Sequence, residues 1–296
     1  MSWTSLSQVY SPMSGNPNID DLIWTNQVSY NYELPAPTTI NYSFDSSAAV
    51  AVPGNIGVST MDPGQEAGVI DMLSYVSSLT GITFTNTTGN SSAPVNLFFG
   101  YSGDFNNGWY GVDYNTVTYG QDANNNIVSL NIQDSILLNS NYDSVGSTIP
   151  GSVGYDALLH EIGHALGLKN AEDGPNVLPA NLDSPDVTIM TDAVTLDPGT
   201  QQTYAQFGSL DIAALNWLYG GDGLLGTYGL TVNSSGVPIA GGFNPAQPGQ
   251  TTATGTAGTT LAALTTTAAT ATPVTAATTA GLSVTPNQQG QLFALS

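Results

Sequence analysis

Residues 158–170 read LLHEIGHALGLKN and contain both histidines of the 296-residue chain. His160 and His164 are four residues apart, so on an α-helix they lie one turn above the other on the same face. Two imidazole nitrogens in that position can share one metal ion. Glu161 projects to the side, where a carboxylate can accept a proton from water beside the metal. The pattern therefore predicts a hydrolytic zinc site on a helix.

The segments around this helix predict a mixed architecture. Strand-like and helix-like segments alternate up to about residue 222, and they favour an α+β or α/β layout in which strands come first and the histidine-bearing helix follows. A helix over 63–80 is opened by Asp62 and closed by Gly81. Further helices are expected over 154–166 and 209–219. Strands are predicted at 38–44 (TTINYSF), 81–88 (GITFTNTT), 93–102 (APVNLFFGYS) and 125–134 (NNIVSLNIQD).

Charge restricts the partners that the chain can take. Lys169 is the only basic residue against 22 Asp and Glu, which gives a formal net charge of -21. Such a chain cannot neutralise phosphates, so we expect no nucleic-acid partner, and an anionic membrane surface repels it. No apolar run reaches the roughly 18 residues that a membrane helix needs, so no membrane insertion is expected. The absence of cysteine excludes disulfides and thiolate metal ligands.

Composition changes after about residue 223. Residues 251–280 are 24 Thr or Ala out of 30, with no charged or aromatic side chain. Such a run buries too little apolar surface to offset its ordering entropy, which predicts a linker, a stalk or a loosely packed appendage, although the strand preference of threonine leaves β-structure open. We therefore expect an N-terminal extension (1–18), a catalytic domain (19–223) and a Thr/Ala/Gly-rich tail (224–296).

Several segments together resemble the serralysin-type metzincins, a family of secreted bacterial zinc endopeptidases. The resemblance covers about residues 19–223. It rests on the active-site helix, the opening segment and first strands, a methionine-containing turn and the closing helix. These read GSVGYDALLHEIGHALGL (151–168), NIDDLIW (18–24), INYSF (40–44), TGITFTN (80–86), VTIMTDAV (187–194) and LDIAALNWLYGGDG (210–223).

The resemblance implies a metzincin-like α+β domain with a twisted mixed sheet, an active-site helix and a C-terminal helix. It implies zinc ligands at His160 and His164, Glu161 as general base, Gly167 as the helix-ending glycine and Met190 beneath the metal. It also implies that residues 125–134 form the upper edge strand, against which a peptide or protein substrate pairs.

Two positions depart from the family pattern. The third histidine ligand is replaced by Asn170, and the tyrosine two residues after the turn methionine is replaced by Asp192. Catalytic zinc normally has three protein ligands plus water. The candidates for the third are the side-chain oxygen of Asn170, then Asp192, then Asp173 or its neighbour Glu172, and spacing does not decide among them.

These observations predict a zinc-dependent endopeptidase, slow or specialised because of the changed positions. The alternative is a catalytically impaired relative that serves as an extracellular structural or adhesive module. A third hypothesis is a calcium-binding module, because GGDG at 220–223 is one fragment of a calcium nonapeptide, although an array needs several turns. The sequence leaves the oligomeric state open.

Location is inferred from the same resemblance. The first 21 residues have neither a basic start nor an apolar run, so no classical signal peptide is expected. Family members leave the cell through a one-step (type I) exporter that recognises an uncleaved C-terminal signal, and the ending GQLFALS is compatible with such a signal. The other interpretation of this ending is a last strand that docks on the tail.

Overall fold

The structure is a computed structural model. It describes residues 3–191 and 202–219, except for 12, 25–26, 33–38, 50–51, 53–55, 105–107 and 143–144, together with the short strands at 231–232, 238–239 and 287–293. The predictions for Asp192, for residues 220–223 and for the Thr/Ala run at 251–280 lie outside the described residues.

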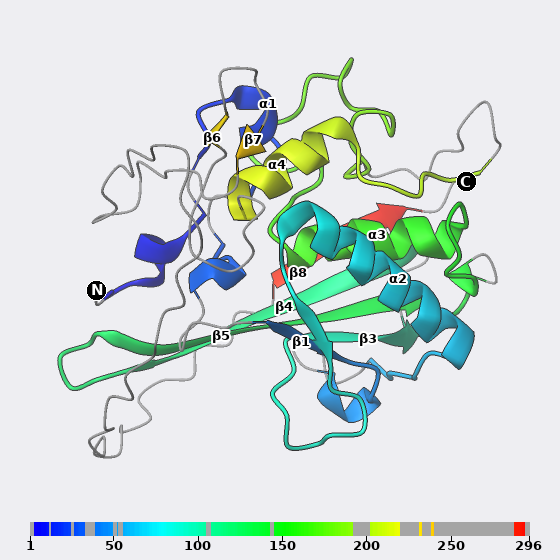
Figure 1. Ribbon diagram of the computed structural model, residues 1–296, viewed down its shortest axis with the longest axis horizontal. Coiled ribbons are helices and arrows are strands. Elements are labelled where there is room, and N and C mark those ends of the chain that lie inside the picture. Colours follow the sequence, from blue (N-terminus) through cyan, green and yellow to red (C-terminus); the bar gives the residue numbers. More distant parts are fainter. Residues whose placement is uncertain are drawn as a thin grey trace, which may run out of the picture.

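The centre of the molecule is a mixed six-stranded sheet (Figure 1). Its strand order is β2-β1-β3-β5-β4-β8; β1, β2, β3 and β5 are parallel, and β4 is antiparallel to both of its neighbours. The strands are β1 (Ile40–Ser43), β2 (Phe84–Asn86), β3 (Leu97–Ser102), β4 (Trp109–Gln121), β5 (Ile127–Asn139) and β8 (Asn287–Phe293). Five of the six come from residues 40–139, and the sixth comes from the predicted tail.

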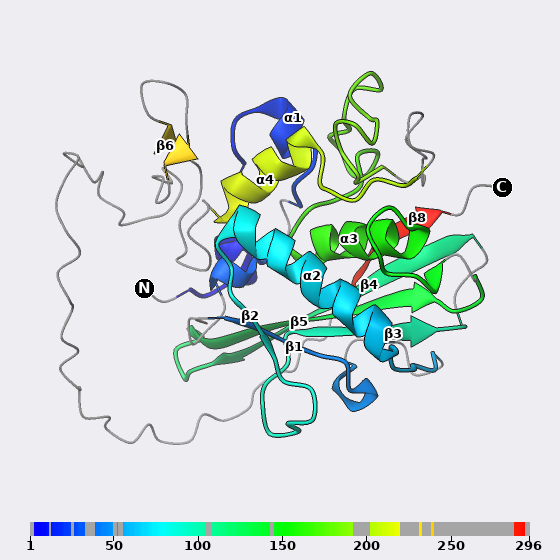
Figure 2. The same cartoon turned by 45° about the vertical axis from the view of Figure 1, so that its right-hand side comes forward.

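The helices lie on one face of this sheet (Figure 2). They are α1 (Pro17–Asp20), α2 (Pro63–Thr80), α3 (Val153–Ala165) and α4 (Ser209–Tyr219). The Asp62 carboxylate accepts the amides of Gly64 and Gln65 at the start of α2, and Gly81 ends that helix in the left-handed conformation with φ 75°. None of the helices in the described part of the chain is both long and apolar enough to cross a membrane.

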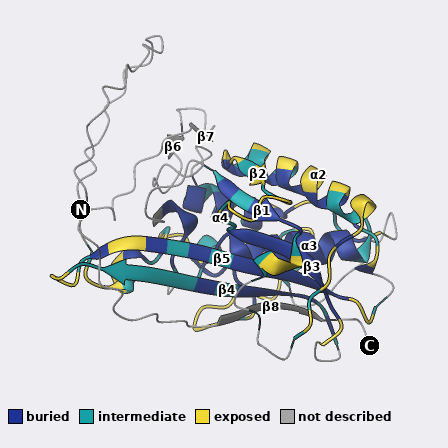
Figure 3. Ribbon diagram, turned by 90° about the horizontal axis from the view of Figure 1, so that it is seen from below, coloured by how far each residue is buried: buried dark blue, intermediate teal, exposed yellow. Residues whose placement is uncertain are grey.

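The main core lies between the sheet and the helices. It includes Val69, Leu73 and Val76 of α2, Leu158 and Ile162 of α3, and Leu215 of α4, all buried. Figure 3 shows that α3 and the strands beneath it are buried along most of their length. A smaller cluster covers the other face of the sheet: Phe98, Val112, Tyr114 and Leu137. Because β3, β4 and β5 carry apolar side chains on both faces, the centre of the sheet is excluded from water.

The remaining elements are short. They are the 3-10 helices Leu6–Val9, Tyr30–Tyr32 and Ser46–Ala48 and a separate pair of strands, β6 (Thr231–Val232) and β7 (Pro238–Ile239). Trp3 forms a bridge with Ile127 at the start of β5. Within the predicted N-terminal extension, Trp3 therefore lies against the sheet.

The structure agrees with the predicted helices to within one residue. Three predicted strand segments contain β1, β2 and β3, and the fourth, 125–134, overlaps β5, which runs on to Asn139. The assignment of residues 125–134 to the edge was wrong. They belong to β5, which lies inside the sheet between β3 and β4, and Ile136, Leu137 and Leu138 near its end are completely buried. Strand β4 was not predicted, and it is this strand, with β8 paired to it, that lies on the outer side.

Candidate metal centre

Helix α3 brings the two histidines into the interior. Its N-terminus is capped by Ser152, whose side chain accepts the amide of Tyr155, and the helix packs against β4 and β5. Gly154 allows a close approach at the first turn, because a Cβ there would lie 2.4 Å from the carbonyl oxygens of Val145 and Ser147. His160, Glu161 and His164 are exposed by at most 1%.

The two imidazoles face each other through their Nε2 atoms, which are 2.9 Å apart. Each ring is held from behind by a main-chain carbonyl. His160 Nδ1 lies 2.8 Å from the oxygen of Ile189, and His164 Nδ1 lies 3.0 Å from the oxygen of Leu168. A carbonyl oxygen only accepts, so both Nδ1 atoms carry the proton and both Nε2 atoms present a lone pair.

Burial keeps both rings neutral. It lowers the pKa of His160 to about 4 and the pKa of His164 well below its usual range. Two lone pairs that face each other repel unless a cation lies between them. Two donors on a tetrahedral zinc ion at about 2.1 Å lie about 3.4 Å apart, so a small outward movement of these rings would admit zinc. The arrangement of the two Nε2 atoms is therefore more favourable with a metal ion between them than without one.

Asn170 is the candidate for the third donor. Gly167, with φ 102°, ends the helix region, and Leu168 N bonds back to Gly163 O at 2.9 Å, which turns the chain toward the histidines. Interaction with the Asn170 side chain raises the pKa of both imidazoles, so its amide lies beside both rings. Its buried Oδ1 has no hydrogen-bond partner among the described residues. The two imidazole nitrogens and the amide of Asn170 therefore lie close together, and the amide oxygen has no other hydrogen-bond partner in the described structure.

Lys169, the only cation of the chain, fixes the loop that carries Asn170. Its buried ammonium group donates to the carbonyl oxygens of Asp173 at 2.7 Å, Asn176 at 2.9 Å and Asn170 at 3.3 Å. Burial lowers the pKa of Lys169, while the charges of Asp173, Asp21 and Glu172 oppose that change. The loop 169–176 is therefore folded around the ammonium group of Lys169.

Met190 packs against the histidine helix at Gly163. Its sulfur is 2.7 Å from the position that a Cβ at Gly163 would occupy, and its side chain is completely buried. Its carbonyl oxygen accepts the amide of Ala171 at 2.8 Å, so the methionine turn and the Asn170 loop are joined. A side chain at Gly163 would displace the end of the methionine side chain.

The buried carboxylate of Asp211, in the first turn of α4, organises the methionine turn. It accepts the Thr188 hydroxyl at 2.5 Å, Ile189 N at 2.8 Å and Gly208 N at 2.9 Å. Burial raises its pKa to about 6, and these three hydrogen bonds oppose the rise. Ile189 O in turn holds the His160 ring. Asp211 therefore positions His160, a candidate metal ligand, without touching it.

Glu161 points toward strand β4. Its Oε1 lies 3.0 Å from the position that a Cβ at Gly111 would occupy, and neither carboxylate oxygen has a hydrogen-bond partner among the described residues. Burial raises its pKa well above the usual range, although the nearby main chain of Asp113, too far or too poorly aligned for a regular hydrogen bond, lowers it. An unpartnered buried carboxylate costs free energy, which indicates a group kept for chemistry rather than for stability.

Two further buried carboxyl groups lie near Glu161: Asp113 of β4 and Asp134 of β5. Burial, Asp134 and Glu161 all raise the pKa of Asp113 well above its usual range. Asp134 accepts hydrogen bonds from the Tyr30 hydroxyl and from Asn115 Nδ2, the latter at 2.7 Å. Burial raises its pKa to about 7, although these hydrogen bonds lower it. These surroundings favour the neutral form of Asp113.

Of the other candidate ligands, Asp173 and Glu172 do not join this group, and Asp192 lies outside the described residues. Asp173 is partly exposed and Glu172 is exposed, and both lie near Lys169. In the described part of the chain, no cluster of three or more His, Asp or Glu side chains is arranged to hold a metal. The candidate centre thus consists of two imidazoles and one amide.

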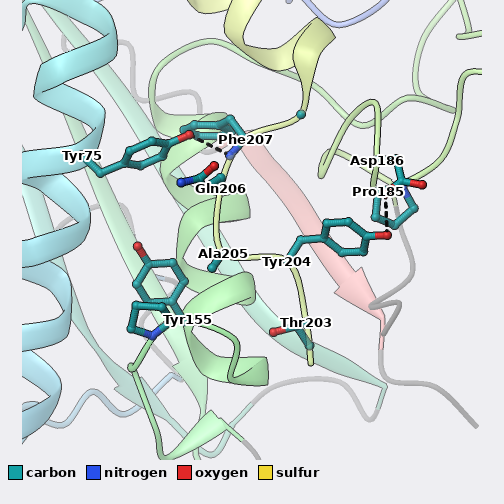
Figure 4. Close-up of a pocket in the computed structure, with 11 residues that line it drawn as sticks. Tyr75, Tyr155, Pro185, Asp186, Thr203, Tyr204, Ala205, Gln206 and Phe207 are labelled. Atoms are coloured by element: carbon teal, nitrogen blue, oxygen red, sulfur yellow. Dashed lines mark hydrogen bonds between the residues drawn. The ribbon is translucent and has the colours of Figure 1, made fainter. Parts of the chain in front are cut away.

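A separate pocket lies near the beginning of the same helix. It has a volume of about 530 Å³, and its lining includes Tyr75 of α2, Tyr155 of α3 and Phe207 (Figure 4). Tyr204 and Asp186 also line this pocket, and the Tyr204 hydroxyl donates a hydrogen bond to Asp186 at 2.9 Å. No histidine lines this pocket, so it is distinct from the candidate metal centre.

The sequence pattern identified His160, Glu161 and His164, but not the residues that support them. Lys169 acts through main-chain carbonyl oxygens of the loop that follows it, and Asp211 acts through the main-chain amide of Ile189, 22 residues away. The spacing of the histidines gives no signal for either. Asp113 could have been found, because WYGVDYNTV alternates as a strand does, although its Gly, Asp and Asn residues weaken that pattern.

The chain was also compared with known proteins. No protein-family model matches it, and no curated protein matches it.

Proposed function

We propose that this chain is a zinc-dependent endopeptidase of the serralysin type. One observation carries the proposal: two neutral imidazoles and an amide oxygen converge with unshared lone pairs, and an unpartnered carboxylate lies on the same helix beside them. Buried polar groups without partners are uncommon where a helix is solely structural. Peptide or protein is the substrate class that the resemblance implies.

His160, His164 and Asn170 are the residues that would hold the ion. When bound, zinc supplies a Lewis acid that polarises a peptide carbonyl and lowers the pKa of water. Ile189 O and Leu168 O keep the Nδ1 atoms protonated, so both Nε2 atoms remain free to donate their lone pairs. Asp211 keeps the Ile189 carbonyl in place through the Ile189 amide.

Glu161 performs the proton transfer. One of its oxygens accepts the proton that the attacking water loses as the new C–O bond forms. The same carboxyl group then gives that proton to the leaving nitrogen as the C–N bond breaks, so each cycle consumes one water and returns Glu161 to its starting state. Gly111 leaves space beside this carboxylate, because any side chain there would contact it.

We expect slow turnover. The position at which the family carries a tyrosine holds Asp192, which cannot donate a hydrogen bond in its ionised form. Loss of one donor to the developing oxyanion costs about 10²-fold or more in rate. An amide oxygen is also a weaker zinc donor than a third imidazole.

The test compares Glu161→Gln with the parent chain and with Glu66→Gln, a matched control in the first turn of α2. Each protein is purified without chelator, its zinc content is measured, and cleavage of an unfolded protein substrate is followed by mass spectrometry. We expect stoichiometric zinc in all three and cleavage by all except Glu161→Gln.

Equal cleavage by Glu161→Gln would exclude Glu161 as the base and overturn the mechanism. A folded parent chain that takes up no zinc would overturn the proposal as a whole and favour the non-catalytic extracellular module. Zinc binding without cleavage of any substrate would favour a metal-stabilised module of the same kind.

A further inference from the structure

The outer strand of the sheet is covered by a segment from far along the chain. Residues 287–293 form β8, which pairs antiparallel with β4 (Figures 1 and 2). Leu292 lies opposite Gly111, and Gln291 lies opposite Val112. The register shifts on both sides of these pairs, so β8 follows β4 through two irregularities. The segment uses the backbone groups that an exposed edge would offer to any extended peptide.

This edge is next to the candidate catalytic carboxylate. Gly111 is the β4 residue against which Glu161 lies, and β8 also contacts helix α3. A chain paired with β4 is therefore placed with its backbone alongside Gly111, close to Glu161. An extended peptide that adds to this edge by backbone hydrogen bonds occupies the position required of a substrate.

The composition of the segment suits this position. Residues 287–293 read NQQGQLF and contain no Asp or Glu, although the whole chain has 22. Asp113, Asp134 and Glu161 are completely buried at or beneath the same edge. A carboxylate brought to this edge would lose hydration beside carboxyl groups that are already buried, so an uncharged segment is favoured.

We propose that residues 287–293 are an intramolecular occupant of the peptide-binding edge, and that the chain thereby holds its own site closed. This inference rests on the proposed function, since it assigns the same site its regulation. An attached segment competes at a high effective concentration, and a free peptide binds only the fraction of molecules in which β8 has left. The complete burial of both histidines and of Glu161 agrees with a closed site.

The absence of cysteine allows a direct test in the full chain. Val112→Cys with Gln291→Cys places two thiols at paired positions, whereas Val112→Cys with Asn287→Cys is out of register, because Asn287 pairs with Asn115. We expect a disulfide in the first variant after mild oxidation and none in the second. Equal crosslinking of both variants, or of neither, would overturn the pairing.

The occupancy is then measured by binding. A labelled peptide with the sequence NQQGQLF is titrated into the paired variant before and after reduction, and into Gln289→Pro/Gln291→Pro, in which proline removes two backbone donors of β8. We expect the peptide to bind the reduced and proline variants at least tenfold more tightly than the oxidised one. Amides of β4 should exchange at least tenfold faster in the proline variant, while those of α2 stay unchanged.

A proline control, Thr266→Pro/Ala268→Pro, should behave as the parent chain does. Equal peptide affinity of the oxidised and reduced paired variant would overturn the inference even if the proline variant failed to fold. These measurements do not depend on hydrolysis. If the peptide-binding results are as expected but Glu161→Gln cleaves as the parent chain does, the proposed function is wrong and the proposal that β8 occupies the edge is retained. If Glu161→Gln loses cleavage but the peptide-binding results are not as expected, only the proposal about β8 is wrong.

Discussion

Each histidine of the candidate centre has its tautomer fixed by one main-chain carbonyl. Because Ile189 O and Leu168 O accept from the Nδ1 atoms, both Nε2 lone pairs point into the same space. Asn170 adds an amide oxygen with no hydrogen-bond partner in the described structure. We therefore expect the zinc affinity of the candidate centre to depend on Asn170, which is a weaker donor than imidazole and lies beside both rings.

Replacing that donor should change zinc affinity in both directions. We expect Asn170→His to bind zinc at least tenfold more tightly than the parent chain, about 1.4 kcal/mol, because imidazole is a better zinc donor than an amide. Asn170→Ala should bind more weakly by a similar factor. Competition with a chromophoric chelator measures both. Affinity that does not change in either variant would exclude Asn170 as a ligand.

Asp211 provides a test of support from a distance. In Asp211→Asn, an NH₂ group replaces one of the oxygens that accept from Thr188, Ile189 and Gly208. We expect a loss of about 2–3 kcal/mol in the free energy of unfolding, measured with urea, because buried donors lose a charged acceptor. Zinc affinity should fall by about 10-fold or more, since Ile189 no longer fixes His160.

The matched control is Asp186→Asn, which removes a carboxylate bonded to Tyr204 at the mouth of the separate pocket. It should leave zinc affinity unchanged. A similar loss of affinity in both variants would show that Asp211 acts through general stability.

At the scale of elements, helix α3 is unusual in being buried almost all round, with Asp156 among its interior residues. Burial raises the pKa of Asp156 from 3.8 to about 8. The folded chain thus holds a proton here that the unfolded chain releases above about pH 4. Stability from this group is complete below pH 4, falls as pH rises, and is lost above about pH 8.

We therefore expect Asp156→Asn to lose less stability than the parent chain when pH rises from 5 to 9. Asparagine resembles the protonated carboxyl group and does not ionise. Urea unfolding at the two pH values measures the effect, and Asp71→Asn, an exposed site on α2, removes the same charge as a control. An identical pH dependence in Asp156→Asn and Asp71→Asn would contradict the assignment.

The elements differ in how far the sequence predicted them. Helix α2 carries a capping aspartate, a proline at its first position and a terminal glycine, so both of its ends were predictable. Strand β4 was missed, because Gly111, Asp113 and Asn115 are poor strand formers and only their place beside β5 and α3 explains them. The pairing of β4 with β8 joins residues more than 170 positions apart, and no local pattern predicts such a contact.

At the scale of the whole molecule, charge is distributed unevenly between surface and interior. The chain carries a formal charge of -21, yet several of its carboxyl groups lie in the interior: Asp113, Asp134, Asp156, Glu161 and Asp211. Burial raises the pKa of each. Burying these carboxyl groups therefore lowers the free energy of unfolding, as is common where function requires ionisable groups.

The buried position of Lys169 makes the folded chain a poor substrate for trypsin. Its peptide bond to Asn170 is the only one that follows a lysine or arginine, and both residues are at most 5% exposed. A single cut there would separate the two histidines from Asn170. We expect zinc to slow this cut, so that the amount of one fragment pair, read from a gel over time, reports how often the loop opens. Cleavage at the same rate with and without zinc would show that loop and ion are not coupled.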